Sequence, residues 1–259
     1  MSGTLQGKVA IVSGSSAGIG AAVAKELAQR GATVVLNYPH AGEKENATKI
    51  LSSFPEPSRS IAVEADISTY QGAKTLVHAA ADAFRKVDIL VNNAGIMLPG
   101  DLDDPDDAKV ESNWERMINL NGRGAYFLTR AVLHVLSREN SRIVNIGSGV
   151  SRVPSTGQSM YAGVKGMLET LTRSWAKELP RKYGCTVNAV APGIVATEGY
   201  LSSPQFVRDM VKPFVDSTPV APRETTPEEV AWTVAMLCEE KAGWLNGVYV
   251  PIAGGSIMI

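Results

Sequence analysis

Short apolar runs alternate with helix-like segments along the whole chain of 259 residues, and this alternation restricts the fold more than any other feature. Turn residues bound each run, and apolar residues at helical spacing follow it, which is typical of strand–helix–strand units. Repeated units of this kind build an open parallel sheet with helices on both faces. The sequence therefore predicts an α/β fold with a single doubly wound, Rossmann-like sheet of about seven strands. The expected strands are 8–12, 33–37, 60–64, 88–91, 142–147, 186–191 and 247–252.

Two patterns mark helix starts in the second half of the chain. Ser112 to Glu115 reads as a capping box, and we expect it to open a long helix. Two glycines in the interior of that helix, at 122 and 124, predict close helix packing or a local irregularity. Thr226 to Glu229 reads as a second capping box, with proline directly after the cap.

The segment 194–224 has no clean period and contains several prolines. A segment of this length in a compact domain is typical of a lid or a binding loop. Nothing else in the chain reads as a linker or a repeat. We therefore expect a single domain, 1–259, with a substrate lid at 194–224.

Composition excludes several function classes. The formal net charge of −1 gives no electrostatic case for nucleic acid or an anionic membrane as a partner. The cysteines are Cys185 and Cys238, and the histidines His40, His78 and His134 are scattered, so no metal site is expected. No apolar stretch approaches the roughly 18 residues of a membrane span, and no signal peptide is readable. The sequence favours a soluble cytoplasmic protein.

A glycine-rich turn joins the first expected strand to a helix. Gly14, Gly18 and Gly20 follow the strand that ends at Val12, and Ile19 opens the apolar face of the helix. Missing side chains let the backbone approach a pyrophosphate, and the helix N-terminus supplies N–H groups and positive potential. The alternative is an ordinary tight turn; the strand–turn–helix context favours a dinucleotide site.

Tyr161 and Lys165 are four positions apart in a segment, 159–183, that reads as a helix, so their side chains share one face. An ammonium beside a phenol favours the phenolate, and we expect the pKa of Tyr161 to fall below its usual value of about 10. A phenol of this kind is a proton donor usable near neutral pH. Ser148, at the end of a strand, is placed to hold a substrate oxygen; alternatively it caps the turn after the strand.

The motifs in this order resemble those of the short-chain dehydrogenase/reductase family over essentially the whole chain. The matching stretches are GSSAGIG at 14–20, ADI at 65–67, NNAG at 92–95, NLNGRG at 119–124, Ser148, YAGVK at 161–165 and PGIVAT at 192–197. The resemblance implies a nicotinamide cofactor and hydride transfer to or from a carbonyl carbon. One departure is visible: Ser13 stands where the family usually has threonine, which retains a hydroxyl.

The resemblance implies a role for each matched residue. Tyr161 exchanges a proton with the substrate oxygen, Ser148 binds that oxygen, and Lys165 holds the nicotinamide ribose. Asn121 connects the lysine to a proton-relaying water; its neighbour Asn119 competes for this role. The predicted catalytic residues are Asn121, Ser148, Tyr161 and Lys165.

The cofactor is expected to contact residues from the glycine turn and from the ends of later strands. The resemblance implies that Asp66 contacts the adenine, Asn93 and its neighbours the adenosine side, and Val195 and Thr197 the nicotinamide carboxamide. Asp66 could instead cap the following helix, and Thr197 could be an ordinary lid hydroxyl. The predicted cofactor-binding residues are Gly14, Ser16, Gly18, Ile19, Gly20, Asn37, Asp66, Ile67, Asn93, Ala94, Gly95, Tyr161, Lys165, Val195 and Thr197.

The end of the second strand bears on the choice of cofactor. It reads Leu36-Asn37-Tyr38-Pro39-His40 and lacks the acid that would repel a 2′-phosphate. This pattern and the serines of the glycine turn resemble NADPH-using reductases, so NADP is favoured over NAD. No arginine stands nearby; His40 or Lys44 is the candidate basic partner, or both are ordinary loop residues.

The sequence thus predicts an NADP-dependent oxidoreductase acting on a small-molecule carbonyl or alcohol, with a ketone or 3-oxoacyl-type reductase favoured. The alternatives are an NAD-dependent alcohol dehydrogenase, a non-catalytic dinucleotide-binding protein, and an isomerase or dehydratase with bound cofactor. By resemblance, a homotetramer or homodimer is expected through the two long helices.

Overall fold

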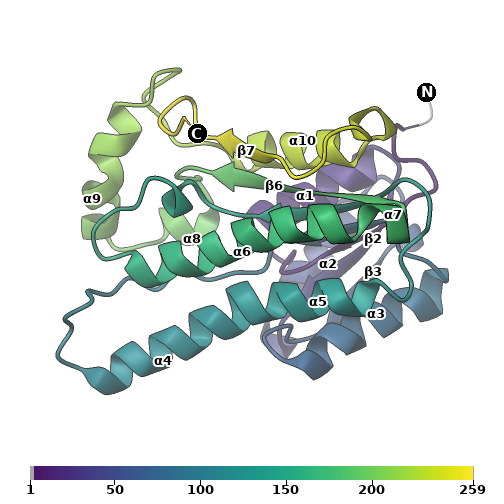
Figure 1. Cartoon of the computed structure of the whole chain (residues 1–259), viewed down its shortest axis with the longest axis horizontal. Coiled ribbons are helices and arrows are strands. Elements are labelled where there is room, and N and C mark those ends of the chain that lie inside the picture. The colour runs from purple at the N-terminus through teal and green to yellow at the C-terminus, as the bar shows by residue number, and fades with distance from the viewer. Residues whose placement is uncertain (1–2, 259) are drawn as a thin grey trace.

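The computed structural model describes residues 3–258 and contains a sheet of seven parallel strands, as predicted. The strand order is β3-β2-β1-β4-β5-β6-β7, so the order reverses between β1 and β4 (Figure 1). Parallel strands buried on both faces are rich in Val, Ile and Leu, which explains the apolar runs in the sequence. The strands are β1 (Val9–Val12), β2 (Thr33–Tyr38), β3 (Ile61–Glu64), β4 (Ile89–Asn92), β5 (Ser141–Ile146), β6 (Cys185–Pro192) and β7 (Tyr249–Ile252).

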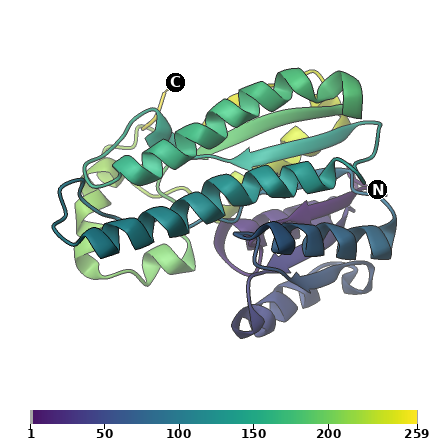
Figure 2. The same cartoon turned by 60° about the horizontal axis from the view of Figure 1, so that its bottom comes forward.

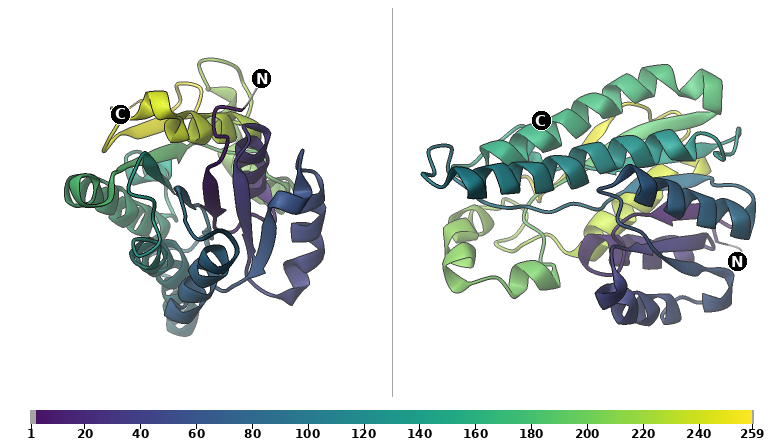
Figure 3. Two further views of the ribbon diagram at one scale, coloured as in Figure 1. Left: turned by 90° about the vertical axis from the view of Figure 1, so that its right-hand side faces the viewer. Right: turned by 90° about the horizontal axis from the view of Figure 1, so that it is seen from below.

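Two groups of helices cover the two faces of the sheet (Figure 3). On one face lie α1 (Gly18–Gln29), α2 (Lys44–Ser52) and α10 (Pro227–Cys238). On the other lie α3 (Tyr70–Phe84), α5 (Ala125–Val132) and α6 (Ser159–Glu178). The short helix α7 (Pro180–Tyr183) follows α6, where Pro180 interrupts the single helix expected over 159–183.

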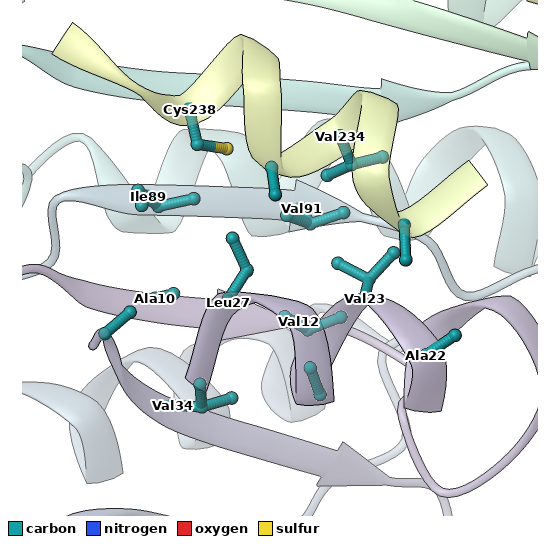
Figure 4. Close-up of a cluster of buried hydrophobic side chains, with 14 of the residues drawn as sticks. Ala10, Val12, Ala22, Val23, Leu27, Val34, Ile89, Val91, Val234 and Cys238 are labelled. Carbon is teal, nitrogen blue, oxygen red and sulfur yellow. The ribbon is translucent and has the colours of Figure 1, made fainter. Parts of the chain in front are cut away.

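The core on the first face forms where α1 and α10 cross over the central strands. Val23 and Leu27 of α1 and Val234 of α10 point toward Val12 and Val91 (Figure 4). All five side chains are fully buried. This packing fixes the start of α1, and with it the glycine turn, above the ends of β1 and β4.

Helix α10 begins as predicted. The Thr226 hydroxyl accepts a hydrogen bond from Glu229 N at 3.2 Å, and the Glu229 carboxylate accepts one from Thr226 N at 2.8 Å. The capping box therefore satisfies two backbone donors that the helix itself leaves unpaired.

The capping box predicted at Ser112 is wrong. Helix α4 (Asp107–Met117) begins earlier, because the Asp106 carboxylate accepts a hydrogen bond from Lys109 N at 3.0 Å and serves as the N-cap. Ser112 lies on the exposed side of a helix already formed. The preceding acidic run conceals the cap, since Asp101, Asp103 and Asp104 are residues of the same good N-cap type.

The glycines at 122 and 124 lie in a π-helical segment, Ile118–Gly124, that joins α4 to α5. A Cβ at Gly124 would lie 2.8 Å from the carbonyl oxygen of Ile67. The predicted irregularity and the predicted close packing are therefore both confirmed. The continuous rod of α4, the π-helical segment and α5 lies beside α6 (Figure 2).

The segment 194–224 folds into two helices, α8 (Glu198–Leu201) and α9 (Gln205–Asp216), beyond the end of β6 (Figure 1). Sequence periodicity did not predict α9 because Pro213 lies inside it. The two ends of the segment are joined: Thr225 N donates to Ile194 O and Ala196 N donates to Thr225 O, each at 2.9 Å. No helix within residues 3–258 is both long and apolar enough to cross a membrane.

Candidate active site

A cavity of about 1180 Å³ opens at the carboxyl ends of the strands. Val12 of β1 pairs with both Leu36 of β2 and Val91 of β4, so these strand ends are aligned and the loops after them meet at one edge. This edge includes the point where the strand order reverses, which is where open α/β sheets bind ligands. The cavity is lined by every residue predicted to bind cofactor, and by Ser148.

The glycine turn forms one wall of the cavity. Gly14 and Gly18 have φ angles of 59° and 55°, which favour glycine, and a Cβ at Gly20 would lie 2.3 Å from Gly14 O. The N-cap of α1, Ala17, makes no side-chain cap, and the first turn carries no acidic residue. The first N–H groups of α1 therefore lack side-chain acceptors, and the turn fits a pyrophosphate.

Hydrogen bonds from Ser13 and Asn93 hold the turn against β4. Ser13 Oγ accepts from Asn93 N at 3.0 Å and from Ala94 N at 3.1 Å. The Asn93 side-chain amide donates to Ser13 O and Gly14 O, both at 2.9 Å. The serine hydroxyl thus makes the cross-strand contacts here without a threonine methyl group.

Asn37 braces the same turn from the β2 side. Its Oδ1 accepts from Gly14 N at 2.9 Å, its Nδ2 donates to Ala65 O at 3.0 Å, and the residue is only 1% exposed. Asn37 borders the cavity, but both ends of its amide bind backbone, which is a positioning role for the glycine turn.

Asp66 and Thr197 lie at the cavity with different local roles. Asp66 is exposed, and its Oδ1 accepts from Ser68 N at 3.0 Å; the N-cap of α3 is Thr69 instead. Thr197 caps α8 by accepting from Tyr200 N at 3.2 Å. The alternative of a helix cap is therefore wrong for Asp66, whereas Thr197 does cap a helix.

Asn121 occupies the π-helical segment and is 1% exposed. Its amide exchanges two hydrogen bonds with Ile96, accepting from the N–H at 2.9 Å and donating to the C=O at 2.8 Å. Asn121 does not line the cavity; it fixes the backbone that follows β4.

The Tyr–Lys pair lies on one face of α6, as predicted. The Tyr161 phenol hydrogen-bonds the side chain of Ser148, and Lys165 Nζ lies 5.8 Å from the centre of the Tyr161 ring. Lys165 Nζ donates to Ile146 O at 2.8 Å, which anchors the buried ammonium at the end of β5. Ser148 also caps the turn after β5, accepting from Val150 N at 3.4 Å, so the alternative of a turn cap is confirmed.

The predicted direction of the Tyr161 pKa is wrong. Burial raises the pKa of Tyr161 to about 12, and the hydrogen bond from Ser148 offsets this only in part. Burial also lowers the pKa of Lys165 to about 8. Removal from water disfavours the charged forms of both groups. Tyr161 is therefore a protonated phenol at neutral pH.

Sequence reasoning missed Glu43 and Ile257 at the site. Glu43 lines the cavity beyond the end of β2, as does His40, which was a candidate basic partner. Glu43 is an acid in the region that the sequence analysis took to lack one. Ile257, close to the C-terminal end of the described chain, also lines the cavity, and its Cδ1 would lie 1.9 Å from a Cβ at Gly149. Only Glu43 had a local signal, its place at the start of the helix after β2.

Comparisons with known proteins agree with this geometry. A family model described as enoyl-(acyl carrier protein) reductase matches residues 14–256. The short-chain dehydrogenase/reductase FrzI from Cladobotryum sp. is 38% identical over 99% of this chain and 98% of its own length. L-xylulose reductase from Aspergillus niger is 32% identical over 98% of this chain and 99% of its own length. A short-chain dehydrogenase from Burkholderia cenocepacia, crystallised in complex with NADP, has a TM-score of 0.86 and 34% identity, covering 98% of this chain and 99% of that chain.

A Rossmann-like sheet whose glycine turn faces a Ser–Tyr–Lys cluster defines an oxidoreductase. The chain belongs to the short-chain dehydrogenase/reductase family, whose members act on carbonyl and alcohol groups.

Proposed function

We propose that this protein is an NADP(H)-dependent reductase of a ketone, working through Ser148, Tyr161 and Lys165. The observation that carries the proposal is the cluster of Ser148, Tyr161 and Lys165 at the wall of the cavity. A phenol with a pKa of about 12 holds its proton at neutral pH, which is the form that donates to a carbonyl oxygen. The reverse reaction needs the phenolate, which burial disfavours.

Each residue has a separate task in the proposed reaction. The Ser148 hydroxyl holds the carbonyl oxygen beside the Tyr161 phenol, and Tyr161 donates its proton to that oxygen as negative charge develops there. Lys165 is held by Ile146 O and binds the cofactor ribose. A bound nicotinamide supplies the hydride. Asn121 positions the backbone of Ile96 at the edge of the site.

The cavity wall fits a dinucleotide. The N–H groups of Gly18 and Ile19 would hold the pyrophosphate, and a side chain at Gly20 would block the close approach of backbone. Asp66, Asn93 and Ala94 would contact the adenosine half. Val195 and Thr197 would contact the carboxamide half.

Preference for NADP over NAD is proposed from the NADP-bound relative and from the end of β2, where no acid follows the strand directly. His40 lines the cavity there and is the basic candidate for a 2′-phosphate, whereas Glu43 opposes it. We expect kcat/KM with NADPH to exceed that with NADH at least tenfold, or about 1.4 kcal/mol. The reverse ratio would overturn the preference.

Substitution of Glu43→Gln should raise kcat/KM for NADPH roughly tenfold with little change for NADH, because it removes a like charge from the phosphate region. The matched control is Glu45→Gln, on an exposed residue of the same segment that does not line the cavity and pairs with Lys49. Initial rates with both cofactors measure the effect. An unchanged ratio in Glu43→Gln would place the phosphate elsewhere.

The segment 194–224 is proposed to be the lid over the substrate. Val207, Met210, Val211 and Phe214 of α9 line the cavity, so an apolar body on the ketone is favoured. The test is a panel of aliphatic, cyclic and 3-oxoacyl ketones assayed by loss of NADPH absorbance. An isomerase would convert its substrate without that loss, and a binding protein would show no turnover.

A homotetramer or homodimer is proposed through the long helices. Trp114 of α4, Tyr126 of α5 and Met167 of α6 are exposed on this side of the molecule, which supports an apolar contact between copies. Light scattering on the purified protein would measure the assembly.

A further inference from the structure

Tyr249 of β7 reaches across the end of the sheet to the backbone of Ser148. Its phenol donates to Ser148 O at 2.7 Å and accepts from Ser148 N at 3.1 Å. One side-chain hydroxyl therefore satisfies both backbone groups of the residue proposed to hold the substrate oxygen. Tyr249 does not line the cavity, so any effect of it on the reaction passes through Ser148.

This contact depends on a glycine next to Ser148. A Cβ at Gly147 would lie 2.7 Å from the Tyr249 hydroxyl oxygen and 2.8 Å from Cε2. Gly147 has no positive φ and is buried, so backbone conformation does not require a glycine here. The space that the missing side chain leaves is the space that the phenol fills.

A polar cluster lies between Tyr249 and helix α6. Ser151 Oγ donates to Glu169 Oε2 at 2.9 Å and lies 2.8 Å from the Tyr249 hydroxyl, whose own proton is donated to Ser148 O. Glu169 is one helical turn beyond Lys165, is 4% exposed, and binds Arg152 and Arg173. Burial opposes its charge, but the hydrogen bonds from the two arginines and Ser151 outweigh burial and lower the pKa of Glu169 to about 2.

Glu169 is therefore charged at every physiological pH, and it lies on the helix that carries Tyr161 and Lys165. Tyr249 contacts Ser151 of this cluster while its own hydrogen bonds go to the backbone of Ser148. The backbone of Ser148 and helix α6 therefore meet at one polar cluster that includes a residue from the last strand.

We propose that Tyr249 is a positioning residue for the reaction: its phenol fixes the backbone of Ser148 so that the serine hydroxyl lies beside Tyr161. The inference rests on the proposed function. Displacement of a positioned group by about 1 Å can cost roughly 10²-fold in rate. Loss of the two hydrogen bonds between Tyr249 and the Ser148 backbone should therefore lower kcat.

The test is Tyr249→Phe, which keeps the ring and removes the hydroxyl. We expect kcat with a ketone and NADPH to fall about 10- to 100-fold, with the dissociation constant for NADPH, measured by fluorescence titration, within twofold of wild type. Tyr183→Phe is the matched control. Tyr183 lies on helix α7, away from the site, and its ring packs under Arg138. The kcat of this variant should equal that of wild type. An unchanged kcat in Tyr249→Phe would overturn the proposal.

A double-mutant cycle separates positioning of Ser148 from a general loss of packing. In a Ser148→Ala background the hydroxyl to be positioned is absent, so Tyr249→Phe should have little further effect on kcat. Fully additive losses would show that Tyr249 acts elsewhere and would overturn the proposal.

Hydrogen exchange at the Ser148 amide gives a readout that needs no turnover. The amide donates to Tyr249, so its protection should drop in Tyr249→Phe and stay unchanged in Tyr183→Phe. If wild type reduces no ketone but this protection drops in Tyr249→Phe, the proposed function is wrong while Tyr249 still fixes the Ser148 backbone. Unchanged protection in Tyr249→Phe would show that Tyr249 does not fix that backbone.

Discussion

Replacement of Tyr161 by phenylalanine is expected to lower kcat for ketone reduction by about 10³-fold or more, while NADPH binding is retained. The phenol is the proposed proton donor, and general acid catalysis by a positioned group contributes about 10²- to 10⁴-fold. Phenylalanine fills the same space without the proton. Because Tyr161 is a half-buried neutral phenol, the substitution removes no charge and should leave the fold intact.

Single-turnover rates and a fluorescence titration with NADPH measure the two halves of this prediction. Tyr70→Phe, on an exposed tyrosine of α3, is the control for the chemical change alone. Near-normal turnover in Tyr161→Phe would contradict the mechanism. Loss of NADPH binding in the same variant would show that the phenol serves the cofactor rather than the substrate.

The substitution Lys165→Met should stabilise the protein at pH 7 and abolish its activity. Burial lowers the pKa of Lys165 from 10.5 to about 8, which corresponds to roughly 3 kcal/mol of cost for holding the charged form. Loss of the charged hydrogen bond to Ile146 O costs about 2 kcal/mol in return. We expect a net gain of about 1 kcal/mol in the free energy of unfolding.

The pH dependence of this gain follows from proton binding. Below pH 8 both the folded and unfolded wild type carry the proton, so the full cost applies. Between pH 8 and 10.5 the unfolded state binds more protons than the folded state, so wild-type stability rises with pH and the advantage of methionine shrinks. Urea unfolding at pH 7 and pH 9.5 measures both values.

Lys177→Met, on the exposed side of the same helix, is the control and should show no such gain. A decrease in stability of Lys165→Met at pH 7 would mean that the hydrogen bond to Ile146 outweighs the cost of burial. Activity should be lost in either case, because methionine cannot hold the ribose.

The strand pattern was predictable because each strand is buried on both faces. A run such as VAIV at Val9–Val12 has no polar residue to interrupt it, and turn residues mark both ends. The α10 start was equally legible, since Thr226 and Glu229 satisfy each other locally. Structural features that depend on residues within about four positions of one another can be predicted from their spacing in the sequence.

Features decided by burial were predicted less well. The spacing of Tyr161 and Lys165 was read as an attractive pair, but the pKa values of both depend on how much water surrounds them. The backbone partners of the Asn37 amide, which follow β1 and β3, were likewise not predicted. Neither desolvation nor a partner from another strand is visible in a local pattern.

Tyr249 shows the same limit at a longer range. It lies 101 residues from Ser148, and nothing in GVYVPI separates a tyrosine that faces the site from one that merely packs in an edge strand. The contact depends on both Tyr249 and Gly147, because the phenol occupies the space that a side chain at Gly147 would fill. Only the sheet order, which makes β7 a neighbour of β6, brings the two together.

The hydrogen bonds that join Ile194 and Ala196 to Thr225 close the segment 194–224, the proposed lid, into a loop with adjoining ends. A loop closed at its base can change length at small cost, because each doubling of length costs only about 0.6 kcal/mol in closure entropy. The strands and the Ser–Tyr–Lys cluster need no adjustment when the residues of this loop change. If the proposed lid selects the substrate, a relative's segment grafted between 194 and 225 should change the substrate range and leave the Ser–Tyr–Lys cluster as it is.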